Sequence, residues 1–336
     1  MNEMPPPLPP HTPRPLLPET SPPFLPGGRR AVRRETGLAV MTLLVMIAAS
    51  AVYRDSFPTA GNFSAILRNL AGDGIMAAGM AVLMIGGAFD LSVGATFSMT
   101  GIVTGWLLKA AGFPVVPAIV CGLAIATFGG LLNGVLVAKV KVNALITTLG
   151  TMQIFKGVAV LIGGPGIGFL PDSFGRLGQA EFLGLQSPVW LMIFVLVLFQ
   201  FLMSRTRFFR KYYYIGGNPR AAFLSGINVQ AMQIVAFMIS GFLAGLAGVS
   251  FAARLSSSVS TAGDGAELRI ITAVILGGAS LTGGKGTIWG TFIGVVFMAI
   301  IGNIMIVAQI SSYWQSIVIG CVLVLAVALD LLWNRK

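Results

Sequence analysis

Residues 115–137 read VVPAIVCGLAIATFGGLLNGVLV and hold no charged side chain. An apolar run of about 20 residues spans the hydrocarbon core of a bilayer as an α-helix, because every backbone polar group is then bonded within the helix. The 336-residue chain is 55% hydrophobic and 10% charged, whereas about 25% of the residues in an ordinary soluble domain are charged. The sequence therefore predicts a membrane protein.

Similar apolar runs recur along the chain and predict about ten transmembrane helices. They fall near residues 37–53, 65–88, 92–110, 115–137, 143–163, 189–204, 231–252, 267–281, 287–308 and 313–333. Glycine or polar residues interrupt the runs 92–110 and 267–281, and such breaks in transporters often mark half-helices near the pathway. The predicted fold class is an all-α polytopic membrane protein.

The first 35 residues differ in composition from the rest. They are rich in proline, include the single histidine, His11, and contain no apolar run, so they predict a disordered cytoplasmic tail. The first apolar run begins near Thr36, too late for a signal peptide, and predicts an uncleaved span. We therefore expect a tail over residues 1–35 and a transmembrane domain over residues 36–336.

The distribution of Lys and Arg predicts the orientation in the membrane. With the N-terminus inside and ten alternating spans, fourteen of these residues fall in cytoplasmic segments and six, Arg269 among them, in outer segments. Because positive charge concentrates on the cytoplasmic side, both termini are predicted to face the cytoplasm. The outer segment 164–188 is rich in Gly and Pro and is a candidate docking surface for an external partner.

Several functions find no support in the residues. The net charge of +11 comes from short loops between apolar runs, which indicates membrane orientation and no nucleic-acid partner. Cys121 and Cys321 lie far apart in apolar runs, so we expect packing residues and neither a disulfide nor a zinc site. Gly286 follows Lys285 where a phosphate-binding loop needs Ser or Thr, so close helix packing explains the neighbouring glycines better. We expect no catalytic site, metal site or ATP hydrolysis on this chain.

An acidic residue interrupts the apolar sequence in the stretch Gly86-Gly87-Ala88-Phe89-Asp90-Leu91-Ser92-Val93-Gly94. An unpaired charge at membrane depth is costly, so the carboxylate of Asp90 requires an explanation. In a structural interpretation, Asp90 caps the helix that begins near Ser92 or pairs with a nearby cation. In a functional interpretation, it lines the substrate pathway.

Polar side chains also occur within later apolar runs. Thr148, Thr151 and Gln153 place hydroxyl and amide groups in the run 143–163, where they either face a water-filled passage or form hydrogen bonds within the protein. Threonine hydroxyls in membrane helices often bond to the carbonyl four residues earlier. The candidate pathway or motif residues are Asp90, Ser92, Gly94, Asn133, Thr148, Thr151, Gln153 and Asn303.

The longest inner segment, 205–230, is basic and then reads Gly216-Gly217-Asn218-Pro219-Arg220-Ala221-Ala222. Proline fits the first turn of a helix, and an asparagine before it supplies a side-chain cap. The sequence therefore predicts a short helix after Pro219, capped by Asn218.

The stretch 86–94 resembles the Gly-Gly-Ile-Asp-Leu-Ser-Val-Gly motif of the permease subunits of ribose/xylose/arabinose-type sugar ABC importers. Ala88-Phe89 stands where that family usually has Gly-Ile, and the acidic position is kept. Residues 143–152 and the glycine-rich block 277–291 resemble the same family, and the matches run from about residue 62 to residue 333. The resemblance implies the vitamin-B12-type importer fold, with ten spans in two pseudo-symmetric halves.

The inner loop resembles the coupling element of that family, whose Glu-Ala-Ala-x-x-x-Gly-Ile pattern forms a short helix seated on the partner ATPase. Arg220 replaces the usual acid, and the two alanines, the glycine and the isoleucine match. The resemblance implies an ATPase-coupling loop that comprises Gly217, Asn218, Arg220, Ala221, Ala222, Gly226 and Ile227.

The resemblance also implies a function and a set of partners. The chain is expected to be the permease of an ATP-driven importer in a bacterial inner membrane, carrying a monosaccharide, with a pentose or deoxyhexose preferred. A periplasmic binding protein delivers the sugar, a cytoplasmic ATPase subunit binds ATP and Mg²⁺, and a second permease copy completes a homo- or heterodimer. No cofactor is expected on this chain itself.

Alternative functions remain open from the residues. Similar permeases carry sugar alcohols or autoinducer-2, and nothing in these residues separates those substrates from a sugar. An ion-coupled secondary transporter usually places paired acids or acid/His relays near the midplane, whereas Asp73, Asp90 and Glu267 form no obvious pair in the sequence. A membrane enzyme would need a catalytic or metal-binding cluster, and neither an intramembrane histidine nor a metal-ligand spacing is present.

Overall fold

A computed structural model of the chain describes residues 29–334. Its helices and strands are α1 (Arg29–Val52), α2 (Ala60–Ile85), α3 (Val93–Lys109), α4 (Val115–Ala138), α5 (Ala144–Gly163), β1 (Gly166–Ile167), α6 (Asp172–Gln179), β2 (Glu181–Phe182), β3 (Leu185–Gln186), α7 (Ser187–Arg205), α8 (Arg207–Gly217), α9 (Pro219–Leu224), α10 (Val229–Leu255), β4 (Ser258–Val259), α11 (Ala266–Leu276), α12 (Ile288–Val307) and α13 (Ser312–Asn334).

The predicted class, an all-α polytopic membrane protein, is confirmed. Within the described part of the chain, seven helices are long and apolar enough to cross a membrane: α1, from Glu35, and α2, α4, α5, α7, α10 and α12. The other three predicted segments correspond to α3, α11 and α13. Helix α11 ends at Leu276, five residues before the end of the predicted run 267–281, because two glycines follow it.

The predicted tail falls mostly outside the described residues. Helix α1 begins at Arg29, within the segment assigned to the tail, and residues 1–28, including His11, are not described.

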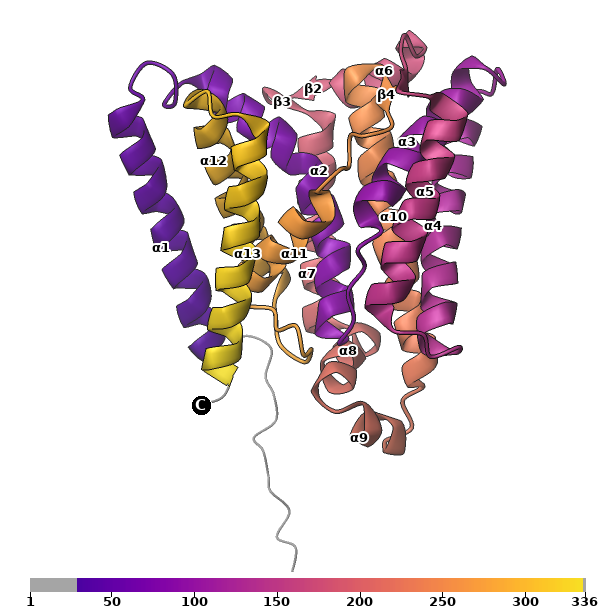
Figure 1. Cartoon of the computed structure of the whole chain (residues 1–336), viewed down its shortest axis with the longest axis vertical. Helices are drawn as coiled ribbons and strands as arrows, with labels where there is room; N and C mark the ends of the chain where they lie inside the picture. The colour runs from indigo at the N-terminus through magenta and orange to yellow at the C-terminus, as the bar shows by residue number, and fades with distance from the viewer. Residues whose placement is uncertain (1–28, 335–336) are drawn as a thin grey trace, which may run out of the picture.

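The bundle has two distinct ends (Figure 1). Helices α8 and α9 lie at the same end as the C-terminal end of α13, and α6 lies with strands β2, β3 and β4 at the opposite end. At that opposite end β1 pairs antiparallel with β4, with Gly166 opposite Val259, which ties the segment after α5 to the segment after α10. These two ends are called the α9 end and the α6 end below.

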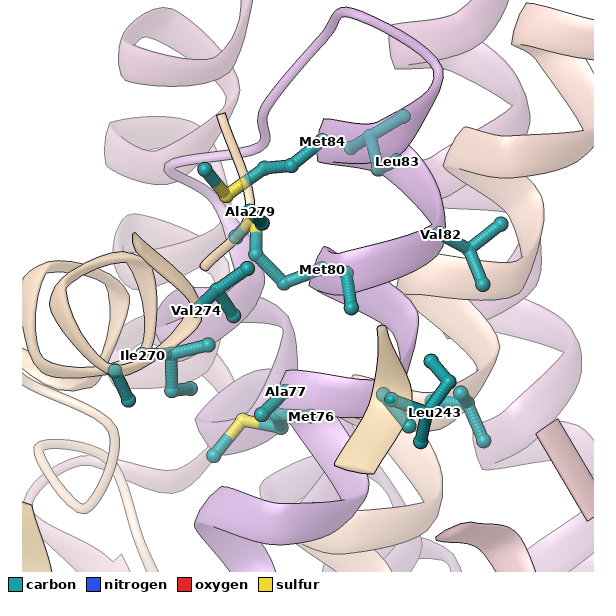
Figure 2. Close-up of a cluster of buried hydrophobic side chains, with 14 of the residues drawn as sticks. Met76, Ala77, Met80, Val82, Leu83, Met84, Leu243, Ile270, Val274 and Ala279 are labelled. Carbon is teal, nitrogen blue, oxygen red and sulfur yellow. The ribbon is translucent and has the colours of Figure 1, made fainter. Parts of the chain in front are cut away.

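Helix α2 is the central helix of the bundle. It packs against α7, α10, α11 and α12, and most of its second half is buried. Figure 2 shows Met80 and Met84 of α2 directed toward Val274 of α11 and toward Ala279, while Leu243 lies beside α2 on another side. Unbranched methionine side chains fill such irregular spaces between helices.

Glycines bring α4 and α10 into direct backbone contact. A Cβ atom at Gly241 would lie 2.5 Å from the carbonyl oxygen of Ala126, and one at Gly134 would lie 2.8 Å from Cα of Ile234. Small residues at such positions let membrane helices approach closely. Helices in lipid associate through this close packing, because lipid tails are as apolar as the helix surfaces and no hydrophobic effect drives the helices together. The α4–α10 contact therefore requires glycine at these two positions, because a Cβ atom there would collide with the backbone of the facing helix.

Helices α2 and α11 end in the same way. Gly87 has φ 83° and Gly278 has φ 95°, and in each case the next residue donates its N–H to the carbonyl five positions back. A left-handed glycine of this kind ends a helix by satisfying its last carbonyls. The two breaks leave α3 and α11 as short helices of 17 and 11 residues.

Candidate functional site

Three of the predicted residues meet between α2, α3 and α4. Asp90 is buried, and its Oδ1 accepts hydrogen bonds from the Ser92 backbone N–H at 2.8 Å and from the Ser92 hydroxyl at 2.6 Å. The same hydroxyl accepts from Nδ2 of Asn133 on α4 at 2.9 Å. Asp90 thus fixes Ser92, the residue that precedes α3, and the bond from Asn133 to Ser92 holds the start of α3 against α4.

The Asp90 geometry agrees with part of the structural interpretation. Its carboxylate bonds to backbone at the start of α3, and among the residues whose side chains are described no cation lies within ion-pair distance of it. Oδ1 of Asn133 is buried and has no hydrogen-bond partner within the described structure. A buried acceptor of this kind is costly unless another group reaches it.

Gly94 has a packing role at the first turn of α3. A Cβ atom there would collide with the carbonyl of Gly263 and would lie 2.6 Å from Oε2 of Glu267. The N–H of Gly263 donates to the Ser98 hydroxyl at 2.8 Å. The segment before α11 therefore crosses the start of α3 at backbone contact distance.

The predicted polar residues of α5 do not join the Asp90 cluster. Thr148 donates its hydroxyl to the Ala144 carbonyl at 2.8 Å, Thr151 donates to the Thr147 carbonyl at 3.1 Å, and Gln153 is exposed. The threonine bonds are the local i−4 bonds that membrane helices commonly form.

Lys156 of α5 is a charged residue outside the set of predicted site residues. It forms an ion pair with Asp264, with 2.8 Å between Nζ and Oδ1. The sequence signal that could have identified Lys156 is its position within an apolar run, because a lysine inside the membrane requires a partner.

A cavity of about 270 Å³ lies between α2, α10, α11, α12 and α13. Of the predicted pathway residues only Asn303 lines it, and the side-chain amides of Asn303 and Asn62 donate to each other at 2.7 Å and 3.0 Å. The wall is mostly apolar, and its polar groups come from Arg68, Asn69, Asp73, Ser250, Arg254, Arg269, Asn303 and Gln315.

An ion pair lines this cavity. Nε of Arg269 lies 2.7 Å from Oδ2 of Asp73, and Nη2 of Arg269 lies 3.0 Å from Oδ1, so the contact is bidentate. Because the partners are 196 positions apart, no pair for Asp73 is evident in the sequence. Arg269, which had been counted with the outer segments, lies in α11.

The predicted short helix and its cap are confirmed. Helix α9 spans Pro219–Leu224, and Oδ1 of Asn218 accepts from the Ala221 N–H at 3.0 Å. Ala222 is buried against the bundle, whereas Gly217 and Arg220 are exposed.

The residues after α9 complete a compact loop. Gly226 has φ 80° and donates its N–H to the Phe223 carbonyl, and Ile227 donates to the Ala222 carbonyl at 3.0 Å. Phe223 and Leu224 are 68% and 78% exposed. Two large apolar side chains held out by a capped turn at the α9 end form a surface suited to a protein partner.

Three pairs of glycines, 86–87, 216–217 and 283–284, meet beside this loop. A Cβ atom at Gly283 would lie 2.8 Å from Cα of Gly87 and 2.9 Å from Cα of Gly216, and the Gly284 N–H donates to the carbonyl of Ile85. The prediction that close packing explains the glycines near Lys285 is confirmed. The contact joins the break after α2, the end of α8 and the segment after α11.

A tyrosine of α8 strengthens this junction. The hydroxyl of Tyr213 donates to the Gly286 carbonyl at 3.0 Å. Burial, with a contribution from the negative charge of Glu35, raises the pKa of Tyr213 to about 12, so the hydroxyl keeps its proton at neutral pH.

Comparison with known proteins identifies the family to which this chain is similar. The family described as "branched-chain amino acid transport system / permease component" matches residues 62–327. Ribose import permease protein RbsC of Escherichia coli strain K12 is 39% identical over 303 residues, which cover 89% of this chain and 93% of that protein. L-arabinose transport system permease protein AraH of the same strain is 35% identical over 292 residues, covering 87% of this chain and 89% of AraH.

A third relative, ribose import permease protein RbsC of Haemophilus influenzae, is 36% identical over 310 residues, which cover 90% of this chain and 94% of that protein. No solved structure matches the chain at a significant level. The matches span the helices that carry the Asp90 cluster, the cavity and the α9 loop. The chain therefore belongs to the family of branched-chain amino acid transport system permease components, and it is the membrane permease subunit of an ABC transporter, with ATP hydrolysis on a separate subunit.

Proposed function

We propose that this permease imports a monosaccharide, with a pentose preferred, that a periplasmic binding protein delivers. The observation that supports this proposal is the similarity, over most of the chain, to permeases named for ribose and for L-arabinose, which are both pentoses. A sugar alcohol, a deoxyhexose or autoinducer-2 stands as the alternative substrate.

The α9 loop is the proposed contact with the cytoplasmic ATPase. The exposed side chains of Phe223 and Leu224 supply the apolar surface, and the cap by Asn218 and the left-handed Gly226 hold its shape. ATP and Mg²⁺ bind the partner subunit in this proposal. Movement there reaches the membrane helices through the glycine junction, which packs α8 against the breaks after α2 and α11.

The α6 end is the proposed docking surface for the binding protein. It carries α6 and the hairpin β2–β3, whose turn exposes 77% of Leu183. With the α9 end in the cytoplasm, both chain termini face the cytoplasm of a bacterial inner membrane, in agreement with the excess of positive charge on that side.

The proposed architecture has ten spans, with α3, α11 and α13 added to the seven long apolar helices. The packing supports two related halves, α2–α5 and α10–α13, because α4 packs against α10 as α12 packs against α2, and α3 packs with α5 as α11 packs with α13. Two such halves, each with one short helix, suit the vitamin-B12-type importer fold. A second permease copy, identical or homologous, completes the channel.

Purification of the tagged chain from native membranes, followed by mass spectrometry, tests the proposal. We expect an ABC ATPase and a periplasmic binding protein to co-purify, with a pentose as the ligand of the binding protein. Recovery of the chain alone, with uptake into vesicles that needs an ion gradient and no ATP, would instead favour a secondary transporter.

A further inference from the structure

The ion pair between Asp73 and Arg269 lies deep within the bundle. Asp73 is near the middle of the 26-residue α2, about 20 Å from either end at 1.5 Å per residue, and Arg269 is in the first half of the short helix α11. Charges at such depth are costly, pair with each other, and mark substrate pathways in membrane proteins. The pair is also only partly covered, because both side chains line the cavity.

The size of the cavity limits its occupant. Its volume of about 270 Å³ falls just below the roughly 300 Å³ at which pockets for drug-sized ligands begin, so it suits a smaller molecule. Its lining residues extend from Arg254, at the α6 end of α10, to Met76, beyond the middle of α2. The cavity therefore extends from the α6 end of the bundle to the ion pair.

The chemistry of the wall matches a polyhydroxylated ligand. Asp73 accepts hydrogen bonds, Arg269 donates them, and the amides of Asn69, Asn303 and Gln315 do both. The rings of Phe97 and Phe251, with centroids 5.3 Å apart, add an apolar wall. A sugar presents hydroxyl groups that donate and accept, together with an apolar C–H face, and needs this combination.

We propose that the cavity is a monosaccharide-binding site within a single subunit, in which the Asp73–Arg269 pair forms hydrogen bonds with sugar hydroxyls. The inference rests on the proposed function and adds to it a site on the permease itself. Arg269 reaches the site from the first half of α11, and Asn303, held by Asn62, lines the α12 side.

The test uses a glycine that lines the cavity. Among the described residues nothing lies within 4 Å of a Cβ atom at Gly302 of α12, a cavity-lining residue, so Gly302→Leu adds a side chain beside the cavity with no clash at its Cβ atom. Gly150→Leu is the matched control, because Gly150 of α5 also faces open space and does not line the cavity. Both variants replace a helical glycine by a good helix former.

Binding is measured on the complete complex in lipid nanodiscs with radiolabelled D-ribose and L-arabinose, and ATP-dependent uptake is measured separately in cells. We expect wild type and Gly150→Leu to bind one pentose, and Gly302→Leu to bind it at least tenfold more weakly. Gly302→Leu should keep normal abundance and ATPase activity. A double variant that keeps hydrogen bonding but removes both charges, Asp73→Asn with Arg269→Gln, should shift the preference between the two pentoses.

Two results would overturn the site. One is pentose affinity in Gly302→Leu equal to wild type. The other concerns a phospholipid bound in the cavity, tested with the double variant Arg68→Gln with Arg254→Gln, because these two arginines line the cavity at the α6 end. The site is overturned if a phospholipid co-purifies with the wild type and is lost in the double variant while the pentose affinity stays unchanged. A wild type that binds pentose but shows no ATP-dependent pentose uptake would contradict the proposed function and leave the proposed binding site standing.

Discussion

Asp90 links the start of α3 to α4 through a single neighbouring residue. Its carboxylate accepts from the backbone and the hydroxyl of Ser92, and Asn133 of α4 donates to the same hydroxyl. Removing an acceptor from buried donors costs about 1–3 kcal/mol, because the donors lose water and gain no partner. Asp90 is thus a positioning residue for the start of α3.

Replacement of Asp90 tests that role. Asp90→Ala should lower the abundance of the protein in the membrane and its ATP-dependent uptake, and Asp90→Asn, which keeps an acceptor oxygen, should have the smaller effect on abundance. Quantitative immunoblots of membranes and uptake rates measure both. Asp55→Asn, at an exposed aspartate, is the control. Wild-type abundance and transport in Asp90→Asn would show that the charge is incidental.

Gly226 controls the shape of the α9 loop through its backbone. At φ 80° a β-branched residue is strained by about 1–3 kcal/mol, whereas asparagine tolerates the left-handed region. Gly226→Val should therefore abolish most uptake and weaken co-purification of the ATPase, with normal insertion into the membrane, and Gly226→Asn should retain both. Equal uptake in the two variants would remove this loop from coupling.

The contact between α4 and α10 is the clearest case of a structure that depends on small residues. Gly241→Ala places a methyl group 2.5 Å from the carbonyl oxygen of Ala126. The clash is with backbone, so no flexible side chain can move aside to relieve it. Gly241→Ala should destabilise the protein by about 1–3 kcal/mol, which is typical for an overpacked core. Gly150→Ala, with open space around it, should be neutral or stabilising.

Thermal unfolding in detergent measures this difference. We expect a lower Tm for Gly241→Ala than for the wild type and an unchanged or higher Tm for Gly150→Ala. Equal Tm values would mean that α4 and α10 separate slightly at no cost, which the close backbone contact argues against.

The two ends of the bundle face opposite sides of the membrane in our proposal. Leu183, in the β2–β3 turn, and Phe223, in α9, are both exposed and lie at opposite ends. In a background with Cys121→Ser and Cys321→Ser, a membrane-impermeant maleimide added to spheroplasts should label Leu183→Cys and leave Phe223→Cys unlabelled. In lysed membranes both should react, which serves as the control. The reverse pattern would invert the proposed orientation.

The sequence predicted local features well. All ten apolar runs correspond to helices, because hydropathy and helix length are properties of neighbouring residues. The cap of Asn218 on α9 was predicted for the same reason, since it bonds an N–H only three positions away. Helix α11 ends before the predicted run 267–281 does, because Gly277 and Gly278 end the helix although the residues around them are apolar.

The sequence by itself thus determined that this chain is a polytopic helical membrane protein, where its ten apolar helices lie, and which permease family it resembles. Only the tertiary structure decided that Arg269 lies beside Asp73, that Asn303 shares their cavity while Thr148 does not, and that three glycine pairs meet. The physical reason is range. Hydropathy and capping act over a few residues, whereas a pair of residues 196 positions apart is joined only by the packing of whole helices.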